Sequence, residues 1–135
     1  DFVTGKIANG AARIKLGLQD SLPLGNLDVE KDWSSANDIV TGLIAIAAQG
    51  YVGDLILASG RSTSLLEILE SAFAYVGIEN WQDYVKTESA LVRQGESKSI
   101  RVDPSHAASV LDWHAMTPTQ EWVGQMVQHH LDQLT

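Results

Sequence analysis

The residues best placed to do chemistry lie in residues 24–40, the stretch LGNLDVEKDWSSANDIV. Lys31 stands between two acids, Glu30 and Asp32, and is followed directly by Trp33. A strand with a tight turn precedes this charged corner, and a helix start follows it. Such corners suit anion binding, because helix N-termini present backbone N–H groups and a positive dipole end. The alternative is an ordinary solvated loop that leads into a capped helix.

The histidines and the known catalytic motifs offer no second centre of chemistry. Adjacent helical residues point about 100° apart, so His129 and His130 cannot chelate a metal as an i, i+4 pair would. His106 and His114 show no metal-ligand spacing either. The sequence contains no Gly-x-Gly-x-x-Gly after a strand and no Gly-x-Ser-x-Gly elbow. We therefore expect no metal site, no cofactor and no catalytic residue in this chain.

Composition excludes several classes of partner. The 135 residues suffice for one core, and 44% are hydrophobic. The net charge of −8 argues against a general affinity for nucleic acid or anionic membranes. No apolar run approaches the roughly 20 residues of a membrane span, and no signal peptide is evident. With no cysteine, the chain is compatible with a reducing cytosol, and we expect it to be cytoplasmic.

Apolar residues at helical spacing predict the elements that must position the corner. We expect helices over residues 1–17, 36–48, 64–76, 103–111 and from 117 onward. Asp1, Ser35, Ser64, Asp103 and Thr117 are the expected N-caps, and Ser64 with Glu67 forms a capping box. Strands are expected over residues 21–27 and 54–58, and the second is apolar throughout, as in a parallel sheet covered on both faces.

Two further expectations concern packing. Trp33, Trp113 and Trp122 should be core anchors, since each lies beside a capped helix with an apolar stripe. In the least periodic stretch, residues 79–99, Trp81 and Tyr84 should serve as anchors. The apolar run of residues 55–58 and a first helix weakened by interior glycines indicate surfaces built to lean on a partner. We therefore expect the isolated chain to self-associate.

Residues 24–34 closely resemble the corner that reads Leu-Gly-Asn-Leu-Asp-Ala-Lys-Arg-Asp-Trp-Gly in GDP-mannose dehydratases, which belong to the extended short-chain dehydrogenase/reductases. The opening FVTGKI resembles that family's Phe-Val-Thr-Arg-Lys-Ile. Residues 54–60 resemble its Tyr-Val-Ile-Ala-Thr-Gly strand, and residues 111–113 its Leu-Gly-Trp. The resemblance thus runs along most of the chain.

The resemblance implies a substrate site of five residues. The family's first helix faces the nucleotide of the sugar donor, so Val3 and Lys6 fall on substrate-contacting positions. Lys31 takes the place of the corner's Arg and keeps its charge without the bidentate fork. Arg93 and Glu96 match the family's Arg-Pro-Thr-Glu, in which the Arg pairs with diphosphate and the Glu holds the ribose.

Several positions depart from the family's pattern. Gly5 stands where the family has Arg, Ser34 where it has Gly, and residues 94–95 differ from its Pro-Thr. Without the resemblance, Lys6 would be interpreted as a solvated helix lysine, and the Arg and Glu three apart as a local ion pair. These departures leave the sugar and the base open, and a sister nucleotide-sugar epimerase or dehydratase remains an alternative.

The resemblance also implies what lies outside this sequence. The superfamily's catalytic Tyr-x-x-x-Lys is absent, so the likeness covers the C-terminal, substrate-binding half. In the family, the N-terminal Rossmann half carries NADP and the acid/base groups. The intact enzyme is a lyase that oxidises C4 of the mannosyl unit, eliminates water across C5–C6 and returns the hydride to C6. Because the sequence begins with Asp1 rather than Met, we interpret it as a fragment or processed product.

We therefore expect an α/β fold: a small mixed, mostly helical lobe of an extended short-chain dehydrogenase, without its Rossmann domain. Residues 1–135 should form a single C-terminal nucleotide-sugar-binding domain whose partners are a GDP-sugar and the missing N-terminal half. The alternative is a non-catalytic protein-interaction module derived from a nucleotide-sugar epimerase/dehydratase. Binding of GDP distinguishes the two.

Overall fold

The computed structural model describes residues 2–91 and 99–135 and has the mixed α/β architecture that was expected. Helices provide most of its regular structure, and the strands are three residues long. In chain order the elements are α1 (Val3–Lys15), β1 (Leu22–Leu24), β2 (Glu30–Asp32), α2 (Ala36–Gln49), β3 (Ser62–Ser64), α3 (Leu65–Tyr75), β4 (Val85–Thr87), α4 (Ser105–Leu111) and α5 (Thr119–Leu134), with 3₁₀ turns η1 (Trp81–Asp83) and η2 (Ser89–Leu91).

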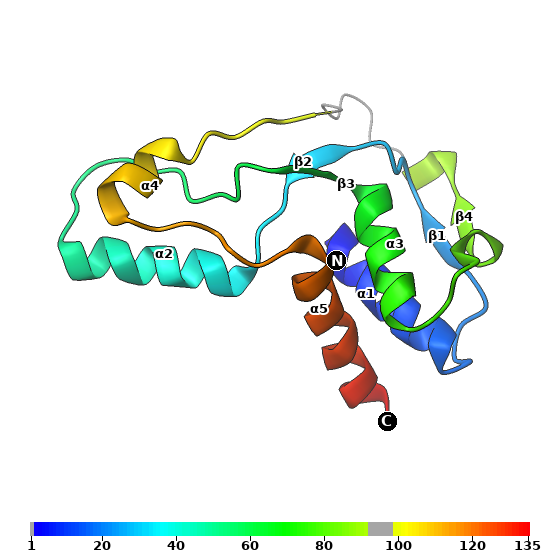
Figure 1. The fold of residues 1–135 in the computed structure, drawn as a ribbon. Helices are drawn as coiled ribbons and strands as arrows, with labels where there is room; N and C mark the ends of the chain where they lie inside the picture. Colours follow the sequence, from blue (N-terminus) through cyan, green and yellow to red (C-terminus); the bar gives the residue numbers. More distant parts are fainter. Residues whose placement is uncertain (1, 92–98) are drawn as a thin grey trace.

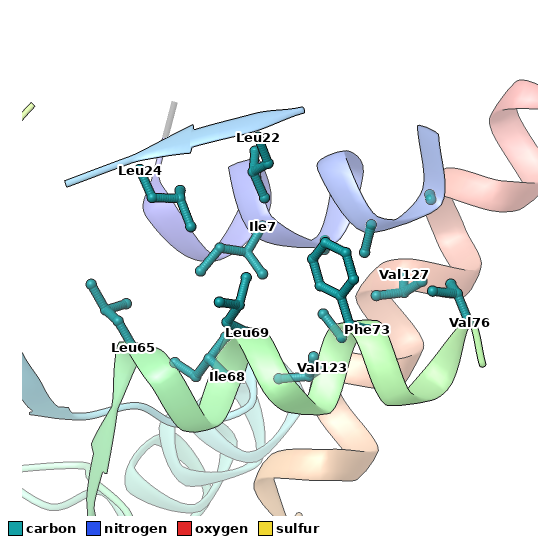
Figure 2. Packing of buried hydrophobic residues seen from close by; sticks show 14 of the residues in the cluster. Ile7, Leu22, Leu24, Leu65, Ile68, Leu69, Phe73, Val76, Val123 and Val127 are labelled. Atoms are coloured by element: carbon teal, nitrogen blue, oxygen red, sulfur yellow. The ribbon is translucent and has the colours of Figure 1, made fainter. Parts of the chain in front are cut away.

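Three helices, α1, α3 and α5, pack around one hydrophobic core, with β1 across one side of it (Figure 2). The apolar stripe of α3 points at α1 and α5, and Phe73 lies fully buried among them. Gly10 marks the closest approach of α1 to β1, because an added Cβ would lie 2.7 Å from a methyl carbon of Leu22. The glycine thus lets the helix and strand backbones come together. We call α1, α3, α5, β1 and β4 the core region.

Two small sheets connect distant parts of the chain. β1 pairs in parallel with β4, with Leu22 opposite Val85. β2 pairs antiparallel with β3, with Lys31 opposite Thr63. Beyond these strands, Glu30 forms a further bridge to Ser99.

α2 and α4 extend away from the core region as an arm (Figure 1). The arm consists of α2, residues 50–58, and residues 103–116 with α4. It has a small apolar cluster of its own, in which Trp113 is buried and a Cβ added to Gly42 would lie 2.9 Å from Leu57. Trp113 Nε1 donates to Thr41 Oγ1 at 2.9 Å, and Gln49 Nε2 donates to the Leu111 carbonyl at 3.1 Å. These bonds tie α2 to α4 and to the residues after it.

The expected helices are confirmed, but their caps are confirmed only in part. Ser64 Oγ accepts from the Glu67 N–H at 3.1 Å, as the capping box requires. Ser35 precedes α2 as expected, yet its side chain makes no capping bond. α4 and α5 each begin two residues after the predicted starts at 103 and 117, and Pro104 and Pro118 are their N-caps. Asp103 Oδ1 still accepts from the Ser105 N–H at 2.9 Å, and hydrogen bonds from Ser105 lower the pKa of Asp103.

Trp122 is buried in the core cluster and Trp33, Trp81 and Tyr84 are partly buried against it, which confirms these anchors, whereas Trp113 is buried in the arm and not in the core.

The strand predicted over residues 54–58 is wrong for the described chain. These residues form no ladder, and Ile56 is 55% exposed. A strand needs a neighbour for its N–H and C=O groups, and the described chain places none beside this segment. β1 lies within the strand predicted over residues 21–27, whereas β2, β3 and β4 were not predicted, because three residues alone give little periodic signal.

No helix in the described parts of the chain is long and apolar enough to cross a membrane.

Candidate functional site

A hollow of about 680 Å³ opens beside the first turns of α1. Lys6 is half-buried in its wall, and Gly5 faces open space, since an added Cβ would meet nothing within 4 Å. Both polar and apolar residues line this space. The lining is Phe2, Thr4, Gly5, Lys6, Asn9, Gly10, Gln19, Leu22, Pro23, Met126 and His130.

A second hollow, of about 720 Å³, lies where the arm meets the core region. It shares Thr4, Met126 and His130 with the first, so the same face of α1 and α5 borders both. Its other wall is the N-terminal end of α2. The residues on that side are Trp33, Ser34, Ser35, Ala36 and Asn37.

The corner that carries Lys31 is held by side-chain hydrogen bonds. Lys31 lies on β2 and is half-buried. Trp33 Nε1 donates to the Thr63 carbonyl at 3.1 Å, which fastens the chain after β2 to β3. Asp32 Oδ1 accepts from the Ser59 N–H at 2.9 Å. The corner is therefore a built structure in this part of the fold and not a solvated loop.

The structure describes three of the five predicted site residues. Val3 and Lys6 lie together on the first turns of α1, where Val3 packs against the core and Lys6 lines the first hollow. Lys31 lies on a different element, β2, and lines neither of the hollows described above. Arg93 and Glu96 fall outside the described residues. The convergence of all five thus stays a prediction, although the described chain resumes at Ser99, whose backbone bridges Glu30 beside Lys31.

Sequence reasoning missed other residues around the first hollow. Asn9 is one turn from Gly5 and Lys6, so helical spacing alone could have placed it on the same face. Gln19 follows the helix and also donates to the Ser21 carbonyl at 2.7 Å. His130 and Met126 come from α5, and no local signal connects them with residues more than a hundred positions earlier.

Electrostatics favour a neutral imidazole at His130. Burial lowers the pKa of His130, and the neighbouring His129 lowers it further. The two rings meet edge to face with centroids 5.6 Å apart. Within residues 2–91 and 99–135, no three His, Asp or Glu side chains gather to hold a metal ion. Lys6 is thus the cationic group on the wall of the first hollow, and the space beside it suits a polar, anionic ligand.

Solved structures share this fold over almost the whole chain. The RMD protein of Pseudomonas aeruginosa, in a complex with NADPH, matches 98% of the chain with a TM-score of 0.87 at 19% identity, over 43% of its own length. A Burkholderia cenocepacia protein described as a putative epimerase matches 93% of the chain with a TM-score of 0.80 at 23% identity. The fold is therefore that of one part of an extended short-chain dehydrogenase/reductase.

Sequence comparison identifies the family. The family model for GDP-mannose 4,6 dehydratase matches residues 1–126. GDP-mannose 4,6 dehydratase 2 of Arabidopsis thaliana is 35% identical over 132 residues, which is 98% of this chain and 35% of that protein. The Sinorhizobium fredii GDP-mannose 4,6-dehydratase is 32% identical over 149 residues, which is 42% of its length. The chain belongs to the GDP-mannose 4,6-dehydratase family, and it spans about two fifths or less of these relatives.

Proposed function

We propose that this chain is the nucleotide-sugar-binding part of a GDP-mannose 4,6-dehydratase-like enzyme. The observation that carries the proposal is the family match over residues 1–126, which includes both the start of α1 and the Lys31 corner. The hollow beside Lys6 supports it, because it offers one cation and several amide and hydroxyl groups to a polar ligand. The charge distribution is also suitable, since a chain of net charge −8 attracts a diphosphate only where its cations gather.

In this proposal the nucleotide contacts Val3, Lys6, Lys31, Arg93 and Glu96. The arginine fork and the two lysines neutralise the diphosphate, and the Glu96 carboxylate accepts from the ribose hydroxyls. This chain's task is to bind and orient the sugar nucleotide. The dehydration itself, loss of water across C5–C6 after oxidation at C4, takes place in the longer protein.

NADP supplies the hydride chemistry of that longer protein, and its site lies outside this chain. The sequence lacks a glycine-rich strand-to-helix turn, which is the usual cradle for a dinucleotide's pyrophosphate. Among the described residues, the strands that precede α2 and α3 are not followed by such a turn either. We therefore assign no residue of this chain to the cofactor.

The arm is the surface on which the rest of the enzyme docks. On α2, Val40, Leu43 and Ile44 are 51%, 54% and 61% exposed, and Ile56 lies exposed on the segment that follows. Contiguous apolar exposure of this kind marks an interaction surface. Because the chain spans about a third of its Arabidopsis relative, we propose that the occupant is the Rossmann half of the same enzyme.

Calorimetric titration of GDP and GDP-mannose tests the site. Arg93→Ala should weaken GDP binding by about 1.5–3 kcal/mol, the range for a hydrogen bond to a charged group. Glu96→Gln should weaken it less, because an amide oxygen still accepts. Lys31→Arg should strengthen it by restoring the bidentate fork. Arg101→Ala removes an exposed cation as a matched control. Equal GDP affinity in the parent chain and Arg93→Ala would contradict the proposed site.

The exposed apolar face of α2 favours a second candidate, a non-catalytic protein-interaction module that has lost its nucleotide site. GDP binding separates the candidates. A module of this kind binds its protein partner through α2 but shows no heat with GDP, and its partner binding survives Arg93→Ala.

A further inference from the structure

Asp32, the last residue of β2, gathers three hydrogen bonds on one carboxylate oxygen. Its Oδ1 accepts from the Ser59 N–H at 2.9 Å, from the Ser59 hydroxyl at 2.9 Å and from the Ser34 hydroxyl at 3.2 Å. The other oxygen, Oδ2, is buried and has no hydrogen-bond partner within the described chain. The carboxylate thus joins the chain after β2 to the turn that leads into β3.

These bonds matter because β2 is a short strand, and they add to its pairing with β3 and to the Trp33 bond to Thr63. A two-stranded sheet is marginally stable in water, and this one has three residue pairs. Hydrogen bonds to a carboxylate are roughly twice as strong as neutral ones. Lys31 stands opposite Thr63, immediately before the residue that makes these bonds. The position of Lys31 therefore depends on how firmly Asp32 fixes the end of the strand.

The connection continues beyond Ser59 to both larger regions of the molecule. Ser59 Oγ accepts from the Arg61 N–H at 3.1 Å, and the Arg61 guanidinium donates to the Thr117 carbonyl at 3.1 Å. The Thr117 N–H in turn donates to Asp38 Oδ2, in the first turn of α2, at 2.9 Å. Asp32 is thus one end of a hydrogen-bonded path that links β2, the entrance of α5 and the start of the arm.

We propose that Asp32 is a positioning residue that holds Lys31 in its place in the nucleotide site. The role of Lys31 in nucleotide binding rests on the proposed function. The effect of Asp32 on the position of β2 does not. Asp32 acts through its hydrogen bonds to Ser59 and Ser34 and does not itself contact the nucleotide. A carboxylate that faced the nucleotide would repel its diphosphate. Asp32 Oδ2 is buried, so it is not exposed to a ligand.

Two substitutions separate position from charge. Asp32→Asn keeps an acceptor oxygen for all three hydrogen bonds. Its amide nitrogen takes the place of Oδ2, which has no hydrogen-bond partner in the described chain. Asp32→Ala removes the acceptor altogether. Asp83→Ala removes an exposed negative charge on η1, and Thr41→Ala removes the acceptor of Trp113 Nε1 in the arm. The last variant lowers the melting temperature without touching the corner, so it controls for general destabilisation.

The first measurement is amide hydrogen exchange in residues 30–32, followed by NMR in the 135-residue chain without ligand. Asp32→Ala should speed exchange there by about tenfold relative to the rest of the protein, because the strand end opens locally. Asp83→Ala and Thr41→Ala should leave it unchanged, and Asp32→Asn should raise it less than Asp32→Ala does, because its neutral oxygen still accepts but makes weaker hydrogen bonds. Unchanged exchange in Asp32→Ala would overturn the proposal.

The second measurement is GDP titration of the same samples. Asp32→Ala should bind about tenfold more weakly, as a site does when it loses preorganisation, while Asp32→Asn should lose less affinity than Asp32→Ala because it keeps the acceptor oxygen. Equal losses in Asp32→Asn and Asp32→Ala would show that charge matters and would overturn the positioning role. If the parent itself fails to bind GDP while the exchange rates respond as expected, the proposed function fails and the fixing of Lys31 stands.

Discussion

α2 and α3 are helices of similar length and similarly apolar sequence, yet α3 is buried and α2 is not. α3 buries Leu65, Ile68, Leu69, Ala72 and Phe73 against α1 and α5. α2, which is described over its whole length, buries Gly42, against Leu57 and Trp113. The difference lies in their neighbours and not in their composition, because an apolar helix face is buried only where another element covers it. The helices of the core region cover one another, whereas the apolar face of α2 is exposed in the described chain.

The largest expected difference comes from replacing a large side chain by alanine in each of the two regions. Trp122→Ala in the core should lower the free energy of unfolding by about 3–5 kcal/mol, since it leaves a large cavity among buried neighbours. Leu43→Ala on the arm should change it by less than about 0.5 kcal/mol, as exposed positions do. Chemical denaturation of both variants measures the difference. Similar losses would mean that α2 is as well packed as the core helices.

A smaller effect is expected from two glycines of α1. A Cβ at Gly10 would meet the Leu22 side chain at 2.7 and 2.9 Å, so Gly10→Ala should cost about 1–3 kcal/mol by overpacking. A Cβ at Gly5 would meet nothing within 4 Å, so Gly5→Ala should stabilise the helix by up to about 1 kcal/mol. Thermal melts of the pair give the sign directly. A stabilising Gly10→Ala would place α1 farther from β1 than the structure does.

Several features of the core region were predictable from the sequence. Ile7, Leu69 and Val127 each belong to a row of apolar residues at helical spacing within their own helix, and each lies on a buried helix face. The Ser64 cap was also predictable, since its partner is three residues away. The strand expected over residues 54–58 was not found, because a sequence pattern reports the environment of the whole protein. An apolar run predicts burial, but it does not say which segment provides the covering surface.

Less of the candidate site could be predicted. Val3 and Lys6 were identified through resemblance, and Asn9 could have been added from helical spacing. The contributions of Met126 and His130 depend on the packing of α5 against α1, which joins opposite ends of the sequence. The role of Asp32 depends on Ser59, which lies 27 residues away. Long-range contacts of this kind carry no local signal.

Self-association should distinguish the arm from the core region without a change in the free energy of unfolding. We expect the 135-residue chain to associate through α2, and Leu43→Glu should abolish this because a charge cannot be buried in an apolar contact without a partner. Leu18→Glu alters an exposed apolar residue in the segment after α1, away from the arm, as the control. Sedimentation at tens of micromolar, roughly the range in which weak interfaces form, measures both. A monomeric parent chain would contradict this prediction.

The smallest effect concerns pH. The pKa of His130 is lowered by burial and by His129, so protonation favours the unfolded state. The stabilising effect of a neutral His130 is complete above the unfolded pKa of about 6.5 and declines as the pH falls through the lower folded pKa. His130→Asn should therefore make the melting temperature fall less steeply between about pH 7 and pH 5. His114→Asn, at an exposed position outside the core region, should leave the slope as in the parent chain.

The packing of α1 on α5 has a consequence for biosynthesis. α1 ends at Lys15 and α5 begins at Thr119, so a ribosome adds roughly a hundred residues between them. Protein synthesis proceeds at about 5–20 residues per second, so Ile7 and Ala11 are uncovered for on the order of 5–20 s before α5 has been synthesised. During that interval α1 is an apolar helix without its main neighbour. The nascent chain therefore keeps the apolar face of α1 exposed until α5 has left the ribosome and can pack against it.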